Sequence, residues 1–211
     1  MVVTDIKEYR KGKYEIYLND AFAFVLYKSE IKQYGIEKDH ELSDNSYEDI
    51  LKVLLPKRAK KRAMNLLLKN DLTEKKLREK LTENKYPTQC IEEAIDYVKS
   101  YHYIDDRRYA HGFIASKAQS TSKSVIRNKL IEKGISKDII DSELNEFYED
   151  DPLNSGVEEE LIKKLLIKKC HGRFDLEYEE RQKIFASIYR KGFSLDKVSK
   201  IFDEIRNESG I

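Results

Sequence analysis

The sequence predicts a mainly α-helical protein, with three tandem three-helix repeats in an elongated, curved array behind a small N-terminal β-rich segment of about three strands. Three observations predict this fold class: strand-like alternation confined to the start of the chain, an apolar pattern that recurs three times, and a lean apolar composition. With glycine counted in place of the 14 tyrosines, roughly 37% of the 211 residues are apolar, whereas about 45–50% is usual. A composition this lean favours a row of small modules over one large core.

Residues 1–55 are predicted to form the β-rich segment plus a short helix. Apolar and polar residues alternate over 13–18, as in a strand with one buried face. Lys-Gly and Asn-Asp turn pairs separate this strand from two others, at about 3–9 and 21–27. Because so small a sheet is not stable alone, we expect the helices that follow to cover one of its faces.

Beyond residue 55 the chain repeats one apolar pattern, first after 49 positions and then after a further 58. In each copy an i, i+4 apolar pair marks a helix, a turn follows, and a second helix carries its own pair. Another apolar helix precedes each copy, so the predicted three-helix repeats are 56–104, 105–152 and 153–211. The recurring positions are Leu77, Leu81, Tyr86, Ile91 and Ile95, then Ile126, Leu130, Ile135, Ile140 and Leu144, then Ile184, Ile188, Phe193, Val198 and Phe202.

Residue types at the predicted helix ends agree with this division. Gly134 and Gly192 occupy the turn in the second and third repeats, where a left-handed backbone can end a helix, while the first repeat has Lys85 there. Ser136 and Ser194 are placed to cap the helix that follows the turn. Each proline is expected at a helix start, and the three are Pro56, Pro87 and Pro152.

Membrane and secreted classes are disfavoured. No apolar run approaches the ~18 residues that a membrane helix needs, and the first residues lack a secretory signal. A cytoplasmic monomer with no membrane partner is therefore expected. Cys90 and Cys170 lie 80 positions apart, fit neither a disulfide framework nor a metal site, and are interpreted as inert core thiols.

Enzymatic function is the least supported class. The Asp pairs at 105–106 and 150–151 are interpreted as helix caps, because two adjacent carboxylates offer too few ligands for a hard cation. The 4 histidines are not spaced as metal ligands, and no Ser or Cys nucleophile is matched with a His base and an acid. The sequence also has no glycine-rich phosphate loop. We expect no catalytic residue, no metal site and no cofactor.

The formal net charge of +1 conceals a pattern along the chain. Residues 57–86 hold 11 basic and 4 acidic residues and residues 107–137 hold 8 and 1, a net charge of +7 in both, whereas 87–106 carries −4 and 138–160 carries −10. Such runs can be solvated helix faces, or they can align in stacked repeats as a basic stripe that attracts phosphates or an acidic protein groove. The candidate partner-binding or DNA-binding cations of this stripe are Lys57, Arg58, Lys61, Arg62, Lys76, Arg78, Lys80, Arg107, Arg108, Lys123, Arg127 and Lys129.

Three segments resemble the RecX family of bacterial recombination regulators: YIDDRRYA at 103–110, LREKL at 77–81 and NKLIEKGI at 128–135. The resemblance extends over about residues 57–206 and includes the tandem three-helix pattern. It implies a non-enzymatic protein that binds the filament of a RecA-type recombinase on single-stranded DNA, with weak or indirect contact to the DNA itself. It also implies inhibition of strand exchange, ATP hydrolysis and co-protease activity in recombination and DNA repair.

The expected mechanism is steric and electrostatic. Several weak basic contacts, made by successive repeats in the groove of the filament, would sum to useful affinity. The third repeat departs from the pattern, since Phe185 and Ser187 stand where the first two repeats have Arg and Lys. Two alternatives remain open: a helical-repeat module that binds DNA directly without a recombinase, and a helical scaffold for an unrelated partner.

Overall fold

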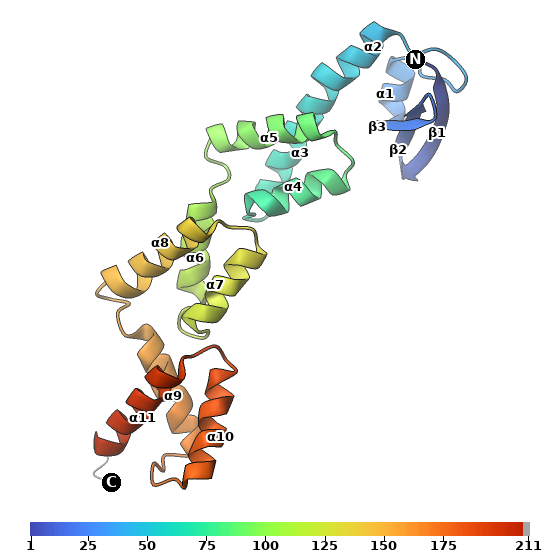
Figure 1. Cartoon of the computed structure of the whole chain (residues 1–211). Helices are drawn as coiled ribbons and strands as arrows, with labels where there is room; N and C mark the ends of the chain where they lie inside the picture. The colour runs from blue at the N-terminus through green and yellow to red at the C-terminus, as the bar shows by residue number, and fades with distance from the viewer. Residues whose placement is uncertain (209–211) are drawn as a thin grey trace. The chain divides into compact units, whose positions relative to one another are not determined.

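The computed structural model describes residues 1–208, and its internal contacts divide it into two compact units, one of Met1–Asp105 and one from Asp106 onward (Figure 1). Each unit is mostly helical, and the first also contains a small sheet. The end of the predicted third repeat, 209–211, lies outside the described residues. The fold class expected from the sequence, helical repeats behind a three-stranded segment, is confirmed, while the repeat boundaries stay predictions.

The sheet is antiparallel, with strands β1 (Val3–Arg10), β2 (Lys13–Leu18) and β3 (Ala21–Tyr27) in sequence order. Two-residue turns connect the strands, and both residues of the second turn, Asn19 and Asp20, have positive φ. This conformation matches the right-handed twist of the strands that it joins.

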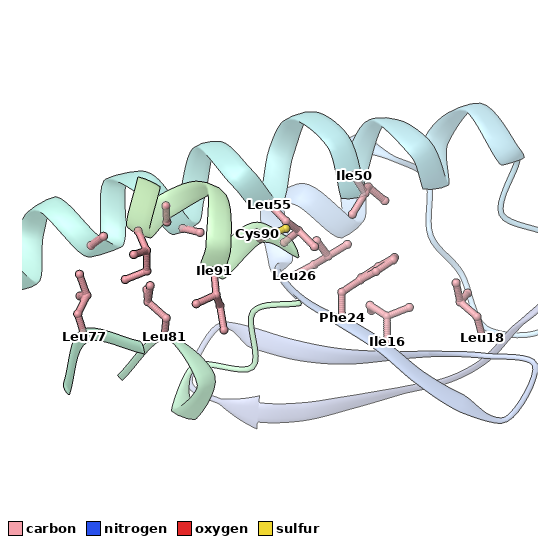
Figure 2. Close-up of a cluster of buried hydrophobic side chains, with 14 of the residues drawn as sticks. Ile16, Leu18, Phe24, Leu26, Ile50, Leu55, Leu77, Leu81, Cys90 and Ile91 are labelled. Carbon is pink, nitrogen blue, oxygen red and sulfur yellow. The ribbon is translucent and has the colours of Figure 1, made fainter. Parts of the chain in front are cut away.

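One long helical run covers the sheet. The short helix α1 (Lys28–Gln33) follows β3, and then α2 (Asp44–Asp49), a π-helical turn at Ile50–Leu54 and α3 (Leu55–Leu67) continue without a break. Sheet residues such as Phe24 pack directly against this run (Figure 2).

The first unit is completed by α4 (Glu74–Glu83) and α5 (Thr88–Ser100). Their apolar residues belong to the same continuous core as those of the sheet, and Figure 2 shows the two groups side by side. The sheet and the first three-helix module therefore form one packed body. Its shared core includes Ile16, Phe24, Leu26, Ile50, Leu55, Leu77, Leu81, Ile91 and Ile95.

The second unit contains two three-helix modules. The first has α6 (Asp106–Lys117), α7 (Lys123–Glu132) and α8 (Lys137–Asn145), which a π-helical turn extends to residue 150. The second has α9 (Val157–Cys170), α10 (Tyr178–Tyr189) and α11 (Leu195–Glu208). Each module has its own apolar cluster, and the recurring positions of the sequence repeat are buried there except for the half-buried Ile184.

The turn between the second and third helices of each module uses a left-handed backbone. Gly134 and Gly192 have φ values of 85° and 88°, and Lys85, at the equivalent position, has 59°. A lysine tolerates this conformation poorly, but the Lys85 ammonium forms an ion pair with the buried Glu15 of β2 and lies 4.7 Å from the centroid of the Tyr9 ring. The residue that breaks the glycine pattern thus joins the first module to the sheet.

One of the three proline predictions was wrong. Pro87 precedes α5 and Pro56 lies in the first turn of α3, where the helical run resumes after the π-helical turn, but Pro152 lies in a turn. The wider π turn in front of Pro56 absorbs the disruption that the ring and the missing N–H cause in a regular helix. Ser136 and Ser194 do cap their helices, each accepting a backbone N–H.

The interpretation of residues 150–151 as a helix cap was also wrong. The Asp151 carboxylate accepts hydrogen bonds from the backbone of Leu153 at 2.9 Å and from the side chain of Asn154 at 2.6 Å. It thereby organises the turn before Gly156, and α9 begins only after that glycine. An Asp side chain readily hydrogen-bonds to backbone two residues ahead, and here that local contact replaces a helix cap.

Candidate partner-binding surface

The predicted basic stripe divides between the two units. Lys57, Arg58, Lys61 and Arg62 lie on α3, and Lys76, Arg78 and Lys80 lie on α4 of the first unit. In the second unit Arg107 and Arg108 lie on α6, and Lys123, Arg127 and Lys129 lie on α7.

Arg58 does not belong to an exposed stripe. Its side chain is 14% exposed and forms a 2.9 Å ion pair with Glu30, which is itself 12% exposed. The guanidinium also donates to the carbonyl oxygen of Val25 at 3.1 Å and lies 4.2 Å from the centroid of the Tyr27 ring. These contacts hold α3 against β3 and α1, so the structure gives Arg58 a packing role.

The arginines at equivalent positions of the first two repeats form equivalent ion pairs. Arg78 of α4 donates from Nη1 and Nη2 to both oxygens of Glu92 on α5, at 2.5 and 2.9 Å, and from Nε to Glu74 at 2.8 Å. Arg127 of α7 donates to Asp141 of α8. Position 127 lies 49 residues after 78, and position 141 lies 49 residues after 92. The repeat therefore reproduces this link between its second and third helices.

The third repeat replaces this ion pair with an apolar contact. Phe185 stands at the position of the arginine, is buried, and lies 5.4 Å from the ring centroid of Phe202. The arginine that the sequence suggested for partner contact is therefore a link within each of the first two modules. Its replacement by a buried phenylalanine shows that the position serves module packing.

Three further cations of the predicted stripe also lie beside carboxylates of their own unit. Arg107 pairs with a carboxylate that is only 3% exposed, so its position is fixed by the need to satisfy a buried charge. The three pairs are Lys76–Glu79 at 2.7 Å, Arg107–Glu143 at 2.7 Å and Lys123–Glu149 at 2.9 Å.

Five cations of the predicted stripe have no carboxylate within ion-pair distance among residues 1–208. Lys80 and Lys129 are repeat equivalents, 49 positions apart, on α4 and α7. Lys57 and Lys61 are four positions apart and share a face of α3. We call this set the unpaired cations: Lys57, Lys61, Arg62, Lys80 and Lys129.

The ion pairs of Arg78 predict an acid-sensitive first unit. Burial alone would raise the pKa of Glu74, but hydrogen bonds from Lys99 and Arg78 outweigh it and hold that pKa below 4.5, and the Arg78 hydrogen bond also lowers the pKa of Glu92. A carboxyl whose pKa is lowered in the folded state stabilises the fold above its unfolded-state pKa, and the stabilisation is lost as pH falls through the folded-state value. We expect Arg78→Gln to reduce the free energy of unfolding at pH 7 and to have little effect at about pH 3.

Urea unfolding of wild type and Arg78→Gln at both pH values, followed by circular dichroism, measures this difference. An equal loss of stability at both pH values would contradict it, because the ion pairs would then contribute nothing that acid removes. Lys32→Gln, at an exposed position on α1, is a control that removes one positive charge without breaking these pairs.

The side chains with chemical reactivity are placed in packing roles. Cys90 and Cys170 are both buried, and burial raises the pKa of the Cys90 thiol to about 11 and raises that of Cys170 as well. In the part of the chain that the structure describes, no three His, Cys, Asp or Glu side chains come together as a potential metal site. Over the same residues, no helix has the length and apolar character to cross a membrane.

One group of cations, in the third module, was not predicted from the sequence. Residues 161–211 hold 12 basic and 8 acidic residues, a net charge of only +4, and this small sum hides that α9 and α10 of the third module bring several lysines together around a depression in the surface. The available signal in the sequence was the lysine pair at 168–169. Their convergence with α10 could not be seen without knowing how the two helices pack.

Tandem three-helix modules behind a small sheet define a helical-repeat protein. Two family models match the chain: the first three-helix domain of RecX over residues 59–97 and the second over 105–144. The chain is 29% identical to "Regulatory protein RecX" of Caldanaerobacter subterraneus subsp. tengcongensis, covering 95% of this chain and 97% of that protein. It is 27% identical to the protein of the same name from Clostridium botulinum strain Eklund 17B, covering 96% and 94%.

Solved structures agree. A crystal structure of regulatory protein RecX matches with a TM-score of 0.64 at 28% identity, over 96% of this chain and 98% of that one. RecX from Lactobacillus salivarius has the same fold, with a TM-score of 0.63 at 23% identity over 72% and 97%. In sequence and in fold the chain is thus similar to the RecX family of regulatory proteins.

Proposed function

We propose that this protein binds the filament that a RecA-type recombinase forms on single-stranded DNA and inhibits its strand exchange, ATP hydrolysis and co-protease activity. The observation that carries the proposal is similarity to RecX proteins across nearly the whole chain, in sequence and in fold. Inhibition would be stoichiometric, by occupancy of the filament.

The unpaired cations are the side chains we propose for contact with the filament. A cation already held by a carboxylate of its own module must lose that partner before it binds another, whereas an unpaired lysine loses only water. Lys80 and Lys129 recur in two modules, so one chain can make the same contact twice, and linked contacts raise affinity without any single strong site. Lys57, Lys61 and Arg62 add charge on α3 of the first unit.

The proposal is tested by the triple variant Lys57→Glu/Lys61→Glu/Arg62→Glu in a strand-exchange assay with the recombinase of the same organism. The three side chains are exposed and make no ion pair among the described residues, so the variant is expected to fold. We expect the concentration that gives half-maximal inhibition to rise on the order of tenfold or more, since each reversed contact costs about 0.5–1 kcal/mol.

The matched control is Lys11→Glu/Lys28→Glu/Lys32→Glu, which makes the same change in net charge at exposed positions of the first unit outside α3 and α4. It should inhibit like wild type. Loss of inhibition in both variants would assign the effect to net charge alone. If wild type leaves strand exchange unchanged but binds bare DNA with a steep salt dependence, the direct DNA-binding alternative replaces the proposal.

A further inference from the structure

The third module holds a basic depression that the predicted stripe did not include. Its lining residues come from α9, α10 and the residues just after each helix, and both helices are labelled in Figure 1. It has a volume of about 570 Å³. This is within the range of ~300–1,000 Å³ usual for ligand clefts. We call it the α9–α10 lysine pocket, and its basic lining residues are Lys168, Lys169, His171, Lys183 and Lys191.

Helix geometry places these cations together. On α10 and the residues after it, Lys183, Ser187 and Lys191 follow each other at intervals of four and so share one face. Lys168 and Lys169 lie in the last turn of α9 and face that surface from the other side. The floor between them includes the apolar side chains of Leu165 and Ile184.

The lysines of the pocket are not paired with carboxylates, unlike the repeated arginines of the first two modules. None of its four lysines has a carboxylate within ion-pair distance among residues 1–208, and the pocket is lined by a single acidic residue, Glu180. Four lysines against one carboxylate leave a net charge of about +3 with histidine neutral. Cations held close together without counter-charges repel one another, and binding an anion relieves that repulsion.

We propose that the α9–α10 lysine pocket binds the phosphodiester backbone of a nucleic acid, independently of base sequence. The proposal deepens the proposed function and rests on it for the choice of single-stranded DNA as the strand that is bound. The third module, which lacks the repeated arginine, would then hold the DNA strand while the unpaired cations of the other modules contact the protein filament.

The chemistry of the pocket favours phosphate over carboxylate. Its cations are all lysines, which act as point charges towards phosphate oxygens, whereas recognition of Asp and Glu side chains favours the forked guanidinium of arginine. The depression is larger than one small anion needs, and Lys168, Lys183 and Lys191 are exposed, so an extended backbone can bring more than one phosphate to them. A backbone site of this kind supplies affinity and no sequence preference.

The test is equilibrium binding of the full-length protein to a fluorescein-labelled 20-nucleotide oligo(dT), measured by fluorescence anisotropy over a range of salt concentrations. Lys168→Ala/Lys183→Ala/Lys191→Ala is expected to raise Kd about 10- to 100-fold at low salt and to make the slope of log K against log salt shallower by about 2. Glu180→Gln, which removes the one carboxylate, is expected to tighten binding roughly 2- to 5-fold. Wild-type binding that is undetectable at low salt would overturn the proposal.

The matched control is Lys164→Ala/Arg190→Ala/Arg206→Ala, which removes three exposed positive charges of the same module outside the pocket. It is expected to bind like wild type, and an equal loss in this control would overturn the proposal. Two competitors identify the ligand. If poly-glutamate displaces oligo(dT) at the same concentration of negative charge, the ligand of the pocket is an acidic protein. If inorganic phosphate does so, the ligand is a free anion. Either result would overturn the nucleic-acid assignment.

The strand-exchange assay separates this proposal from the proposed function. If the pocket variant binds oligo(dT) more weakly but wild type does not inhibit strand exchange, the pocket is supported as a DNA site and the recombinase function is contradicted. If the pocket variant binds oligo(dT) like wild type and wild type does inhibit strand exchange, the pocket is contradicted as a DNA site and the recombinase function is supported.

Discussion

Phe24→Ala is expected to lower the free energy of unfolding of the first unit by about 3–5 kcal/mol. The Phe24 side chain is fully buried at the centre of β3, where the sheet meets the long helical run (Figure 2). Truncation removes its apolar surface from the core and leaves a cavity. The strands on one side and the helices on the other are held by their own packing, so they cannot move together far enough to fill it. Because whole domains are stable by only ~5–15 kcal/mol, this loss would leave the first unit near its unfolding limit.

Amide hydrogen exchange read by mass spectrometry is the appropriate measurement, because it reports each unit of the full chain separately. Protection should fall throughout residues 1–105 and stay unchanged in α9 to α11. Phe22→Ala on the same strand is the control: Phe22 is 43% exposed, and its loss should cost less than about 1.5 kcal/mol. Equal effects of the two substitutions would contradict the assignment of Phe24 to the core.

Gly192→Ala is expected to destabilise the second unit by about 2–4 kcal/mol, the sum of left-handed strain and overpacking. Gly192 has a φ of 88°, and a Cβ there would lie 2.6 Å from Ser122 Oγ and 2.8 Å from Val125 Cγ2. Ser122 is fully buried, and its hydroxyl donates to the carbonyl of Lys191 at 2.8 Å. The methyl group would therefore push against the residue that caps α7 and holds the third module to the second.

The matched control for this prediction is Gly112→Ala. Gly112 lies within α6, and apart from its chain neighbours and the adjacent helix backbone no described atom lies within 4 Å of the position a Cβ would take. Alanine there should stabilise the unit by about 0.5–1 kcal/mol, since glycine in a helix interior carries a larger entropy cost. Hydrogen exchange in residues 106–208 distinguishes the two outcomes. Protection that is retained in Gly192→Ala would show that the turn can relax around a side chain.

Local patterns predicted most of the fold because they act over a few residues. Strand alternation, Asn-Asp turn pairs and serine caps each depend on contacts within four positions, and all three were predicted correctly. The repeat predicted the buried faces of the helices for the same reason. Lys85 shows the limit: the sequence marked it as an exception, and only the ion pair to Glu15, 70 positions away, explains it.

The candidate site was less predictable, because a cation is available to a partner only if nothing nearby already holds it. Arg78 and Lys80 are two positions apart and looked alike in the sequence. In the structure Arg78 is held by two carboxylates, one from another helix, while Lys80 has no ion-pair partner among residues 1–208. Charge reversal at Arg78 or Arg127 would therefore disturb the module as well as any partner contact, and the unpaired cations are the better positions to change.

The π-helical turns were outside the reach of sequence patterns. A regular helix and a helix with one wide turn differ by one residue in their hydrogen bonding, and the apolar spacing tolerates either. Pro56 was the available signal, since a proline can be accommodated within a helical run only where the turn before it changes its bonding. Its predicted place at a helix start is correct for α3, but that prediction says nothing of the π-helical turn in front of it.

The core shared by the sheet and the first module has a consequence for how the chain is made. The N-terminal strands leave the ribosome first, but the helices that cover them, up to α5, follow only after some 70 more residues, which takes about 4–14 s at typical synthesis rates. During that interval the hairpins expose apolar side chains such as Phe24 and Leu26 and are only marginally stable. The first unit therefore folds late relative to its own N-terminus, and the nascent strands depend on α3 to α5 for protection from aggregation.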